Sequence, residues 1–298
     1  MKAKPKIALI GCRNVAPTSA YSLMNGPTGV EVLLVGEFAE PLLRAVASLV
    51  EEMPVRTDSN IRLSEPTELK DAKVCVLSSG VPPLEGDTEE SFLLRNIDIV
   101  REKAELLRNS GFGGVLVVTT YPAEIMAQAA MEAADLSAAS VIGIGPNVAA
   151  GFPENAARPL PLATWCSAAG CSTEFIDSCH PDCPYFEDML ERFHRYQKTT
   201  DQNQLATMAS CVMRICEAVL CDEKAVLPVA ARVTGEHGVT GTFINVPCVI
   251  GSRGIERVLE LPLSDLEHRE LLDRARENGR MFHRLTKRTM AAMNGSIG

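Results

Sequence analysis

The sequence lacks any apolar run that approaches the roughly 20 residues of a membrane-spanning helix. An excess of positive charge is also missing, since the formal net charge is −9. Binding to phosphates takes clustered Lys and Arg, so this balance argues against a nucleic acid partner. We therefore expect a soluble protein that binds neither a membrane nor nucleic acid.

The first residues are not expected to act as an export signal. The basic start Met-Lys-Ala-Lys-Pro-Lys is followed by an apolar run of only Ile7 to Ile10, which predicts a buried strand and not a signal peptide. The 10 cysteines, scattered from Cys12 to Cys248, are therefore expected to be reduced thiols and not a disulfide framework. A cytoplasmic location is the expectation that follows.

Internal repeats, low-complexity segments and flexible linkers are not found either. What is present is a chain of 298 residues, 46% hydrophobic and 22% charged, which is enough for two compact lobes or one large α/β domain. The first half alternates short Val-rich runs with longer amphipathic segments, which is typical of a parallel sheet covered on both faces. The expected strands are residues 6–10, 30–35, 73–78, 114–119 and 141–145, and the expected helices are residues 17–24, 40–52 and 88–109.

After Asn147 the pattern changes to helices mixed with strands. Helices are expected at 184–196, 201–220 and 264–290, the last with Ser264 and Glu267 spaced as a capping box, and antiparallel strands at 225–233 and 241–249. The predicted fold class is α/β, with a Rossmann-like, doubly wound parallel sheet in residues 1–145 and a mixed α+β domain in residues 146–298. A crevice between the two lobes is the expected ligand site.

Six segments carry a resemblance to a known family. They are Lys6-Ile-Ala-Leu-Ile-Gly11, Ser78-Ser-Gly80, Leu94-Arg-Asn96, Pro122-Ala-Glu-Ile-Met126, Val141-Ile-Gly-Ile-Gly-Pro-Asn147 and Val246-Pro-Cys-Val-Ile-Gly251. In this order, and across nearly the whole chain, they resemble segments of the lactate/malate dehydrogenase family. The resemblance implies that family's two-domain fold, an NAD-dependent reaction on 2-hydroxy acids, and assembly as a homodimer or homotetramer.

Hydride transfer to a 2-oxo acid needs a proton donor, a cation that polarises the carbonyl, and an Arg that holds the substrate carboxylate. The resemblance places Ala169 at the position of the catalytic His and Ala149 at the carboxylate that orients it. In the lid that follows Gly80, the position of the polarising Arg is Glu89, so the charge is reversed there.

Two further positions of the same pocket differ from the family pattern. The carboxylate-binding Arg maps near Phe152, with Arg158 the nearest cation downstream, and the Asn that precedes the Pro maps to Tyr121. We therefore assign no catalytic residue, and the resemblance predicts a scaffold that has lost the family's reaction. Gly235-Glu-His-Gly238 matches the catalytic string, yet it falls between two predicted strands, where His237 is expected to be a turn residue.

The dinucleotide fingerprint leaves NAD binding open. In Gly11-Cys-Arg-Asn-Val-Ala16, Arg13 stands where the phosphates would lie, and it can either block the site or form a salt bridge with the anion. The second strand ends at Gly36, where an acidic residue is expected, and Glu37 is one step late. The residues assigned to a dinucleotide site are Gly11, Arg13, Asn14, Val15, Gly36, Glu37, Gly80 and Thr120.

A group of thiols lies near the former catalytic loop. Its members, with one histidine, are Cys166, Cys171, Cys179, Cys183 and His180. Thiolates and imidazole are suitable zinc ligands, but the spacing lacks a Cys-x-x-Cys pair, so ordinary thiols on a loop are the favoured reading and no metal ligand is assigned. Cys171 is also considered as a reactive thiol, although no nearby base is identifiable.

Three functions remain open from the sequence. The first is a dehydrogenase-derived protein that has lost the parental reaction and acts as a ligand-binding or oligomer-partner protein. The second is an active NAD-dependent oxidoreductase with relocated chemistry or an unusual substrate. The third is a regulatory subunit paired with an active paralogue.

Overall fold

The computed structural model describes residues 3–11, 15–26, 29–36, 39–52, 58–144, 201–260, 263 and 265–295 of the chain. The predicted helix 184–196, the capping pair of Ser264 with Glu267 and the predicted domain boundary after residue 145 lie outside the described residues. These three expectations stay predictions.

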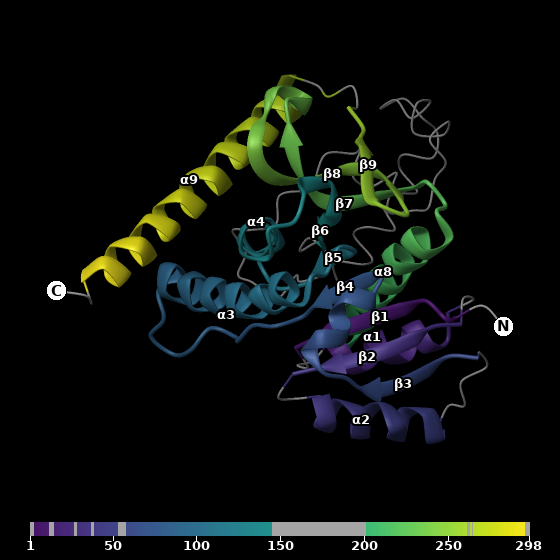
Figure 1. Ribbon diagram of the computed structural model, residues 1–298. Coiled ribbons are helices and arrows are strands. Elements are labelled where there is room, and N and C mark those ends of the chain that lie inside the picture. Colours follow the sequence, from purple (N-terminus) through teal and green to yellow (C-terminus); the bar gives the residue numbers. More distant parts are fainter. Residues whose placement is uncertain are drawn as a thin grey trace.

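One nine-stranded sheet runs through the described part of the chain in the order β3-β2-β1-β4-β5-β6-β7-β8-β9 (Figure 1). Its strands are β1 (Lys6–Ile10), β2 (Glu31–Val35), β3 (Asn60–Leu63), β4 (Val74–Leu77), β5 (Val115–Val118), β6 (Val141–Gly143), β7 (Ala225–Thr234), β8 (Thr240–Gly251) and β9 (Gly254–Val258). Neighbours from β3 to β6 are parallel, and β7, β8 and β9 join as antiparallel strands. Since Gly143 of β6 pairs with Ala230 of β7, the parallel and antiparallel halves share one sheet.

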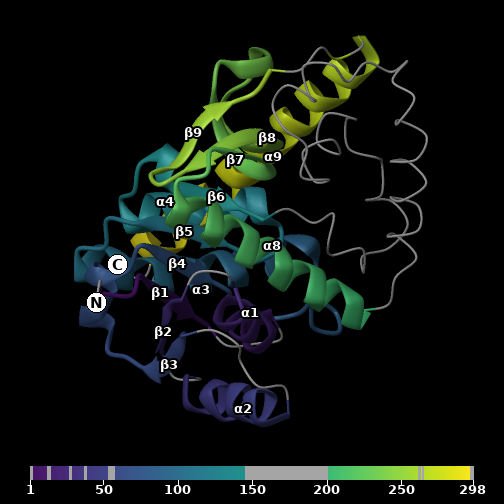
Figure 2. The same ribbon diagram turned by 90° about the vertical axis from the view of Figure 1, so that its right-hand side faces the viewer.

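Helices cover both faces of the parallel half. Those in the described residues are α1 (Val15–Met24), α2 (Ala39–Glu52), α3 (Glu89–Ser110), α4 (Ala123–Ala134), α8 (Asp201–Cys221) and α9 (Asp265–Gly295), with short 3-10 turns η1 (Pro66–Asp71), η2 (Ala138–Ser140) and η4 (Glu236–Gly238). The helices α1 and α8 pack against each other on one face, as Figure 2 shows, and α3 packs against α4 on the other.

Alternation of side chains along β1 explains why an unbroken apolar run forms a strand. Ile7 and Leu9 point into the core that α1, α2 and α8 cover, whereas Ala8 and Ile10 point into the core of α3 and α4. All four are buried. A strand covered on both faces has no polar side, which is typical of the inner strands of a parallel sheet.

The structure confirms the predicted strands and helices in the described residues to within two residues, except that α9 extends to Gly295. It adds two strands and one α-helix that the sequence analysis missed, β3, β9 and α4. The fold class is confirmed as α/β, with a parallel sheet followed by an antiparallel extension.

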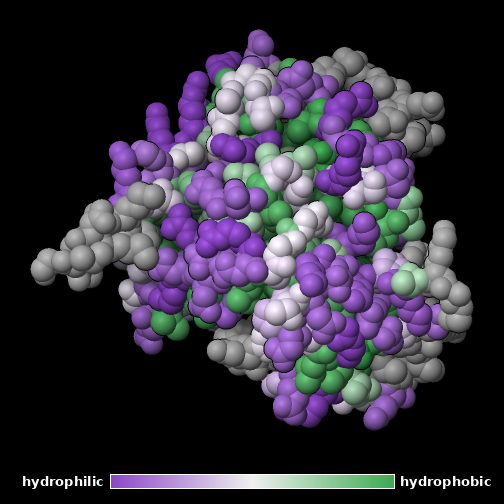
Figure 3. Space-filling view, in the orientation of Figure 1, coloured by the Kyte–Doolittle hydropathy of each residue, from purple (hydrophilic) through white to green (hydrophobic). Residues whose placement is uncertain are grey.

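The surface is predominantly hydrophilic on the face that Figure 3 shows, where hydrophobic residues are visible as patches between polar ones. The large hydrophobic side chains with substantial exposure in the described part are Leu63 and Leu84. Within the same part, no helix is both long enough and apolar enough to cross a bilayer.

Candidate functional site at the carboxyl edge of the parallel sheet

The ends of four parallel strands meet at one edge of the sheet. Gly11 follows β1, Gly36 follows β2, the segment 78–80 follows β4, and the segment 119–121 follows β5. The chain order reverses between β1 and β4, which pair side by side although β2 and β3 intervene in the sequence. In open α/β sheets the crevice outside the strand ends at such a switch point is the ligand site. The candidate site is therefore the edge that holds these loops.

Gly11 is the residue at which the loops after β1 and β4 touch. Its φ is +83°, and a Cβ built there would lie 2.0 Å from Ser79 Oγ and 2.6 Å from the Ser78 carbonyl oxygen. Only glycine fits both the conformation and the space. Gly11 thus has the tight turn that the first glycine of a dinucleotide fingerprint provides, and it lets the loops after β1 and β4 pack closely.

Gly36 ends β2 without supplying a polar group. Its φ is +112°, and a Cβ there would meet no atom within 4 Å. A ribose hydroxyl is normally held by a carboxylate at the end of this strand, and glycine has none. The described part of the site therefore keeps the turn glycine at Gly11 but does not provide the ribose acceptor at Gly36.

Gly80 and Thr120, both assigned from the sequence, are brought together. Thr120 Oγ1 donates a hydrogen bond of 2.5 Å to the Ser79 carbonyl oxygen. A Cβ on Gly80 would lie 2.8 Å from Thr120 Cγ2 and 3.0 Å from Asn96 Oδ1. Gly80 is thus enclosed between the end of β5 and the helix α3.

Asn96 is a residue of this site that the sequence analysis did not assign. Its side chain is 1% exposed, its Oδ1 accepts a hydrogen bond of 2.8 Å from the Val81 N–H, and its Nδ2 donates one of 3.1 Å to the Val81 carbonyl oxygen. The motif Leu94-Arg-Asn96 was noticed, but nothing in the sequence pairs its Asn with Val81. The side chain fixes the first residue of the segment 81–88, where the resemblance placed the lid.

Asp87 fixes the other end of the segment 81–88. Its carboxylate accepts a hydrogen bond of 2.6 Å from the Leu84 N–H and forms an ion pair with the Arg95 guanidinium. The hydrogen bonds from Arg95, then from Leu84, lower the pKa of Asp87 to about 2. Thr88 is the N-cap of α3 and exchanges hydrogen bonds with Ser91, so the helix begins at Glu89.

Glu89 and Tyr121 come from two different elements and interact electrostatically. Glu89 is the exposed first residue of α3, and Tyr121 is the half-buried residue that follows Thr120. Burial raises the pKa of the Tyr121 phenol, and the carboxylates of Glu124 and Glu89 raise it further. The phenol therefore stays protonated at neutral pH, within electrostatic reach of both acids.

Glu124 is a buried carboxyl group in the first turn of α4. It is 7% exposed, and it accepts a hydrogen bond from the Asn245 side-chain amide on β8. Burial raises the pKa of Glu124, while the guanidinium of Arg274 on α9 opposes this shift. The pair links α4, which follows β5 of the parallel half, to β8 of the antiparallel half.

His237 is a turn residue between β7 and β8, as the sequence predicts. It lies in η4 with a φ of 52°, its N–H donates a hydrogen bond of 2.6 Å to the Glu260 carboxylate, and its carbonyl oxygen lies 2.9 Å from His268 Nε2. The string Gly235-Glu-His-Gly238 therefore forms a turn.

Many of the assigned positions lie outside the described residues. Of the dinucleotide set these are Arg13, Asn14, Glu37 and the side chain of Val15. Of the positions inferred from the family pattern and the thiol group they are Ala149, Phe152, Arg158, Ala169, Cys166, Cys171, Cys179, Cys183 and His180. In the ranges that are described, no group of three or more His, Cys, Asp or Glu side chains could hold a metal ion.

The cysteines of the described ranges form no disulfide bond with one another. Burial raises the pKa of Cys216 to about 12 and raises that of Cys75 and Cys248 as well. Such thiols carry almost no thiolate at neutral pH, so they are inert packing residues.

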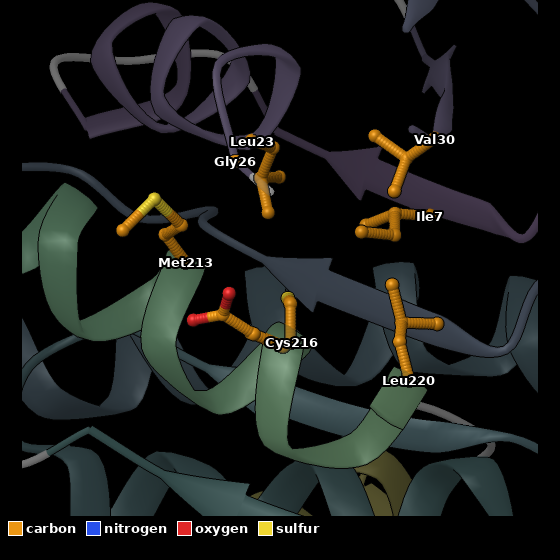
Figure 4. Close-up of a pocket in the computed structure, with 8 residues that line it drawn as sticks. Ile7, Leu23, Gly26, Val30, Met213, Cys216 and Leu220 are labelled. Atoms are coloured by element: carbon orange, nitrogen blue, oxygen red, sulfur yellow. The ribbon is translucent and has the colours of Figure 1, made fainter. Parts of the chain in front are cut away.

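A small apolar pocket lies between α1 and α8, near the amino ends of β1 and β2 (Figure 4). It is lined by Ile7, Leu23, Gly26, Val30, Met213, Cys216, Glu217 and Leu220. Because α1 starts at the carboxyl edge and runs back along the sheet, its last residues and this pocket lie at the opposite edge. The pocket is therefore not part of the candidate site.

These features together define an α/β protein with a Rossmann-type nucleotide-binding half joined to an antiparallel half. Two family models match the chain: "lactate/malate dehydrogenase, NAD binding domain" over residues 5–143 and "lactate/malate dehydrogenase, alpha/beta C-terminal domain" over residues 198–278. The chain belongs to the lactate/malate dehydrogenase family.

Relatives and solved structures agree with this family. The L-lactate dehydrogenase of Lacticaseibacillus casei is 24% identical over 91% of each chain, and that of Pediococcus acidilactici is 26% identical over 91% of each chain. A lactate dehydrogenase from a deep-sea metagenome library superposes with a TM-score of 0.75 at 20% identity, covering 95% of this chain and 100% of the other. The Cryptosporidium parvum lactate dehydrogenase, solved with lactic acid and nicotinamide adenine dinucleotide, gives a TM-score of 0.71 at 19% identity, covering 96% and 99%.

Proposed function

We propose that this chain has lost the family's NAD-dependent reaction on 2-hydroxy acids and acts as a ligand-binding or oligomer-partner protein. Fold similarity does not carry a reaction across, because the reaction depends on specific side chains at the site. The observation that carries the proposal is the joint replacement at Glu89, Tyr121, Ala149 and Ala169.

The arrangement at the start of α3 supports this proposal. Glu89 is an acid where a carbonyl-polarising cation is needed, and an acid would repel the charge that develops on the substrate oxygen. The next cation along α3, Arg95, is engaged in the ion pair with Asp87 and so is held at the segment 81–88. It does not replace the missing cation.

The missing proton donor adds to the same conclusion. Losing a positioned general acid or base lowers a rate by roughly 10²–10⁴. The groups of one site act as a unit, so the losses are not multiplied. With a methyl group at both Ala149 and Ala169, no group at these positions can transfer a proton.

The test is a turnover assay with lactate or malate and NAD, and with pyruvate or oxaloacetate and NADH, followed by nicotinamide absorbance. We expect no rate above the uncatalysed background, with the Lacticaseibacillus casei enzyme as the active control. Turnover in the ordinary enzymatic range, about 1–10³ s⁻¹, would contradict the proposal. In the variant with A149D, A169H and E89R combined, any gain of activity would support the assigned positions.

The second candidate is an active oxidoreductase with relocated chemistry or an unusual substrate. The backbone at Gly11 favours it, since the glycine conformation suited to a dinucleotide is kept. Calorimetric titration with NAD and NADH separates the two, because an oxidoreductase of this kind needs the cofactor. Absence of binding at millimolar cofactor would end this candidate.

The assembly is proposed to be a homodimer or homotetramer, as the family pattern implies. Light scattering on purified protein would measure the mass directly, and a stable monomer would contradict this. A hetero-oligomer with an active paralogue would instead appear as a second chain that copurifies with the untagged protein.

A further inference from the structure

The exposed side of the C-terminal helix α9 carries a row of cations. Arg280, Arg284 and Lys287 are spaced i, i+4 and i+7, so they lie on one face of the helix, about 10 Å from end to end at 1.5 Å per residue. All three are exposed, whereas Leu285 on the other side of the helix is completely buried in the core of α3 and α4. This part of α9 is thus amphipathic, with its charges on the outside.

Acids do not neutralise this cation row in the part of the chain that the structure describes. No ion pair found in that part includes Arg280, Arg284 or Lys287. The Arg284 guanidinium contacts the sulfur of Met281 at 3.0 Å, which does not compensate its charge. Glu277 is the last acid in the sequence. The row is therefore a local excess of positive charge in a protein whose net charge is −9.

The helix α3 carries a row of acids with the same spacing. Asp98, Glu102 and Glu105 are all exposed and are spaced i, i+4 and i+7. Lys103 forms an ion pair with Glu102 at the surface, and an exposed pair of this kind is weak. Arg101 lies at the side of the row and is less exposed. The acid row is thus accessible to cations of another molecule.

The two rows belong to adjacent helices. Figure 1 shows α9 beside α3, the two helices contact each other, and Leu285 lies in the same hydrophobic cluster as Ile97, the residue before Asp98. This region of the surface therefore has a positive row and a negative row of equal length. Such a region is complementary to itself, because a two-fold axis can bring the positive row of each copy onto the negative row of the other.

We propose that the cation row of α9 and the acid row of α3 form an interface between two copies of this chain. The cation row of each copy pairs with the acid row of the other, so the contact is made twice. Arginine suits this role, because its guanidinium binds a carboxylate through two parallel hydrogen bonds. The inference rests on the homo-oligomeric assembly proposed above and names a surface that forms it.

A second copy is favoured over other anionic partners because it uses both rows. A nucleic acid or an anionic membrane would be attracted by the cation row and repelled by the acid row beside it. Complementary charges across an interface mainly determine which partner is chosen and how fast it associates. Reversing the charges of one row is therefore the sharpest test.

Two variants with reversed charges test the interface, with the mass measured by analytical ultracentrifugation. R280E/R284E/K287E makes both rows acidic, and D98K/E102K/E105K makes both rows basic. Each variant alone has like charges across the interface, so its mass should fall to half that of the wild-type assembly. When the two variants are mixed in equal amounts, the wild-type mass should return, because every contact between them then joins opposite charges.

Each reversal should weaken association by roughly 100-fold or more, since like charges placed against each other across an interface are strongly unfavourable. The control K70E/R253E/R257E reverses three exposed cations outside the two helices and changes the net charge by the same amount, so it should keep the wild-type mass. Sodium chloride at 1 M should also weaken the wild-type association, because it screens exposed charges. Circular dichroism checks that each variant is folded, and R284E mixed with E102K repeats the test if a triple variant does not fold.

The proposal is overturned if either reversed variant keeps the wild-type mass, if the control dissociates in the same way, or if the mixture does not reassemble. A monomeric wild type would overturn it together with the proposed assembly. Turnover of lactate would contradict the proposed loss of the reaction and would leave this interface unaffected.

Discussion

Asn96 binds the backbone of Val81 with both ends of its side-chain amide, through hydrogen bonds of 2.8 and 3.1 Å. The two residues are 15 positions apart, and the amide is almost completely buried. The side chain of a helix residue thereby supplies hydrogen-bond partners for the backbone N–H and carbonyl of Val81, which lies in a loop. The start of the segment 81–88 is fixed to α3 in this way, beside the candidate site.

Replacing Asn96 with Ala should destabilise the protein by about 1–3 kcal/mol, because two buried backbone groups of Val81 lose their partner. Urea unfolding measures this change, and limited proteolysis should show faster cleavage within residues 81–88. The matched control is N109A, at an exposed position of the same helix. Equal stability of N96A and N109A would show that Asn96 does not fix the segment.

Replacing Gly80 with Ala should cost roughly 1–3 kcal/mol, because the new methyl group would lie 2.8 Å from Thr120 Cγ2 and 3.0 Å from Asn96 Oδ1. Chemical unfolding of G80A, of T120S and of the double variant tests this contact. T120S removes Cγ2, so the double variant should recover part of the loss. G113A is the control, since a Cβ on Gly113 meets no atom within 4 Å. Strict additivity of G80A and T120S would contradict the assigned clash.

Replacing Glu124 with Gln should stabilise the protein at neutral pH while keeping an acceptor for Asn245. Burial raises the pKa of Glu124 above its ordinary value of 4.5, so the folded state holds the proton more tightly than the unfolded state. The stability that Glu124 contributes is complete below pH 4.5 and is lost as the pH rises through the higher folded pKa. Unfolding free energies of wild type and E124Q should therefore diverge upward from pH 4.5. A constant difference across this range would refute the assigned ionisation.

Replacing Asp87 with Asn should loosen the segment 81–88 and change the response to acid. The pKa of Asp87 is about 2, below its ordinary value of 3.8, because Arg95 and the Leu84 N–H bind the carboxylate. The stabilisation is thus complete above pH 3.8 and is lost as the pH falls toward 2. The difference in unfolding free energy between wild type and D87N should be steady above pH 4 and should shrink below it. D98N, an exposed acid on α3, is the control.

The elements that could be predicted from the sequence are those with a clear apolar period or an unbroken apolar run. Strands β1, β2, β4 and β5 have an unbroken apolar run, because both of their faces are buried. Helix α4 was missed because every residue from Ala123 to Met131 is buried, so it has no polar face to give a helical period. Strand β3 was missed because it is a short edge strand with Asn60 and Leu63 exposed.

For the candidate site, the sequence could supply residues but not partners. Gly11 and Gly80 lie in segments that resemble the family's, and the structure brings them and Thr120 to one edge of the sheet. The pairing of Glu124 with Asn245 spans 121 positions, and no local pattern records a contact at that distance. Sequence patterns reflect neighbours along an element, whereas this contact depends on how β8 is placed against α4.

The parallel and antiparallel halves of the sheet meet at one register pair, Gly143 of β6 with Ala230 of β7. A side chain larger than hydrogen does not fit at Gly143, since a Cβ there would lie 2.8 Å from the Cβ of Ala230. A fragment ending after β6 would leave the backbone groups of that strand facing water, and unpaired strand edges promote association between molecules. We therefore expect each half on its own to associate through this edge. The two halves expressed as separate polypeptides should stay soluble only when they are produced together.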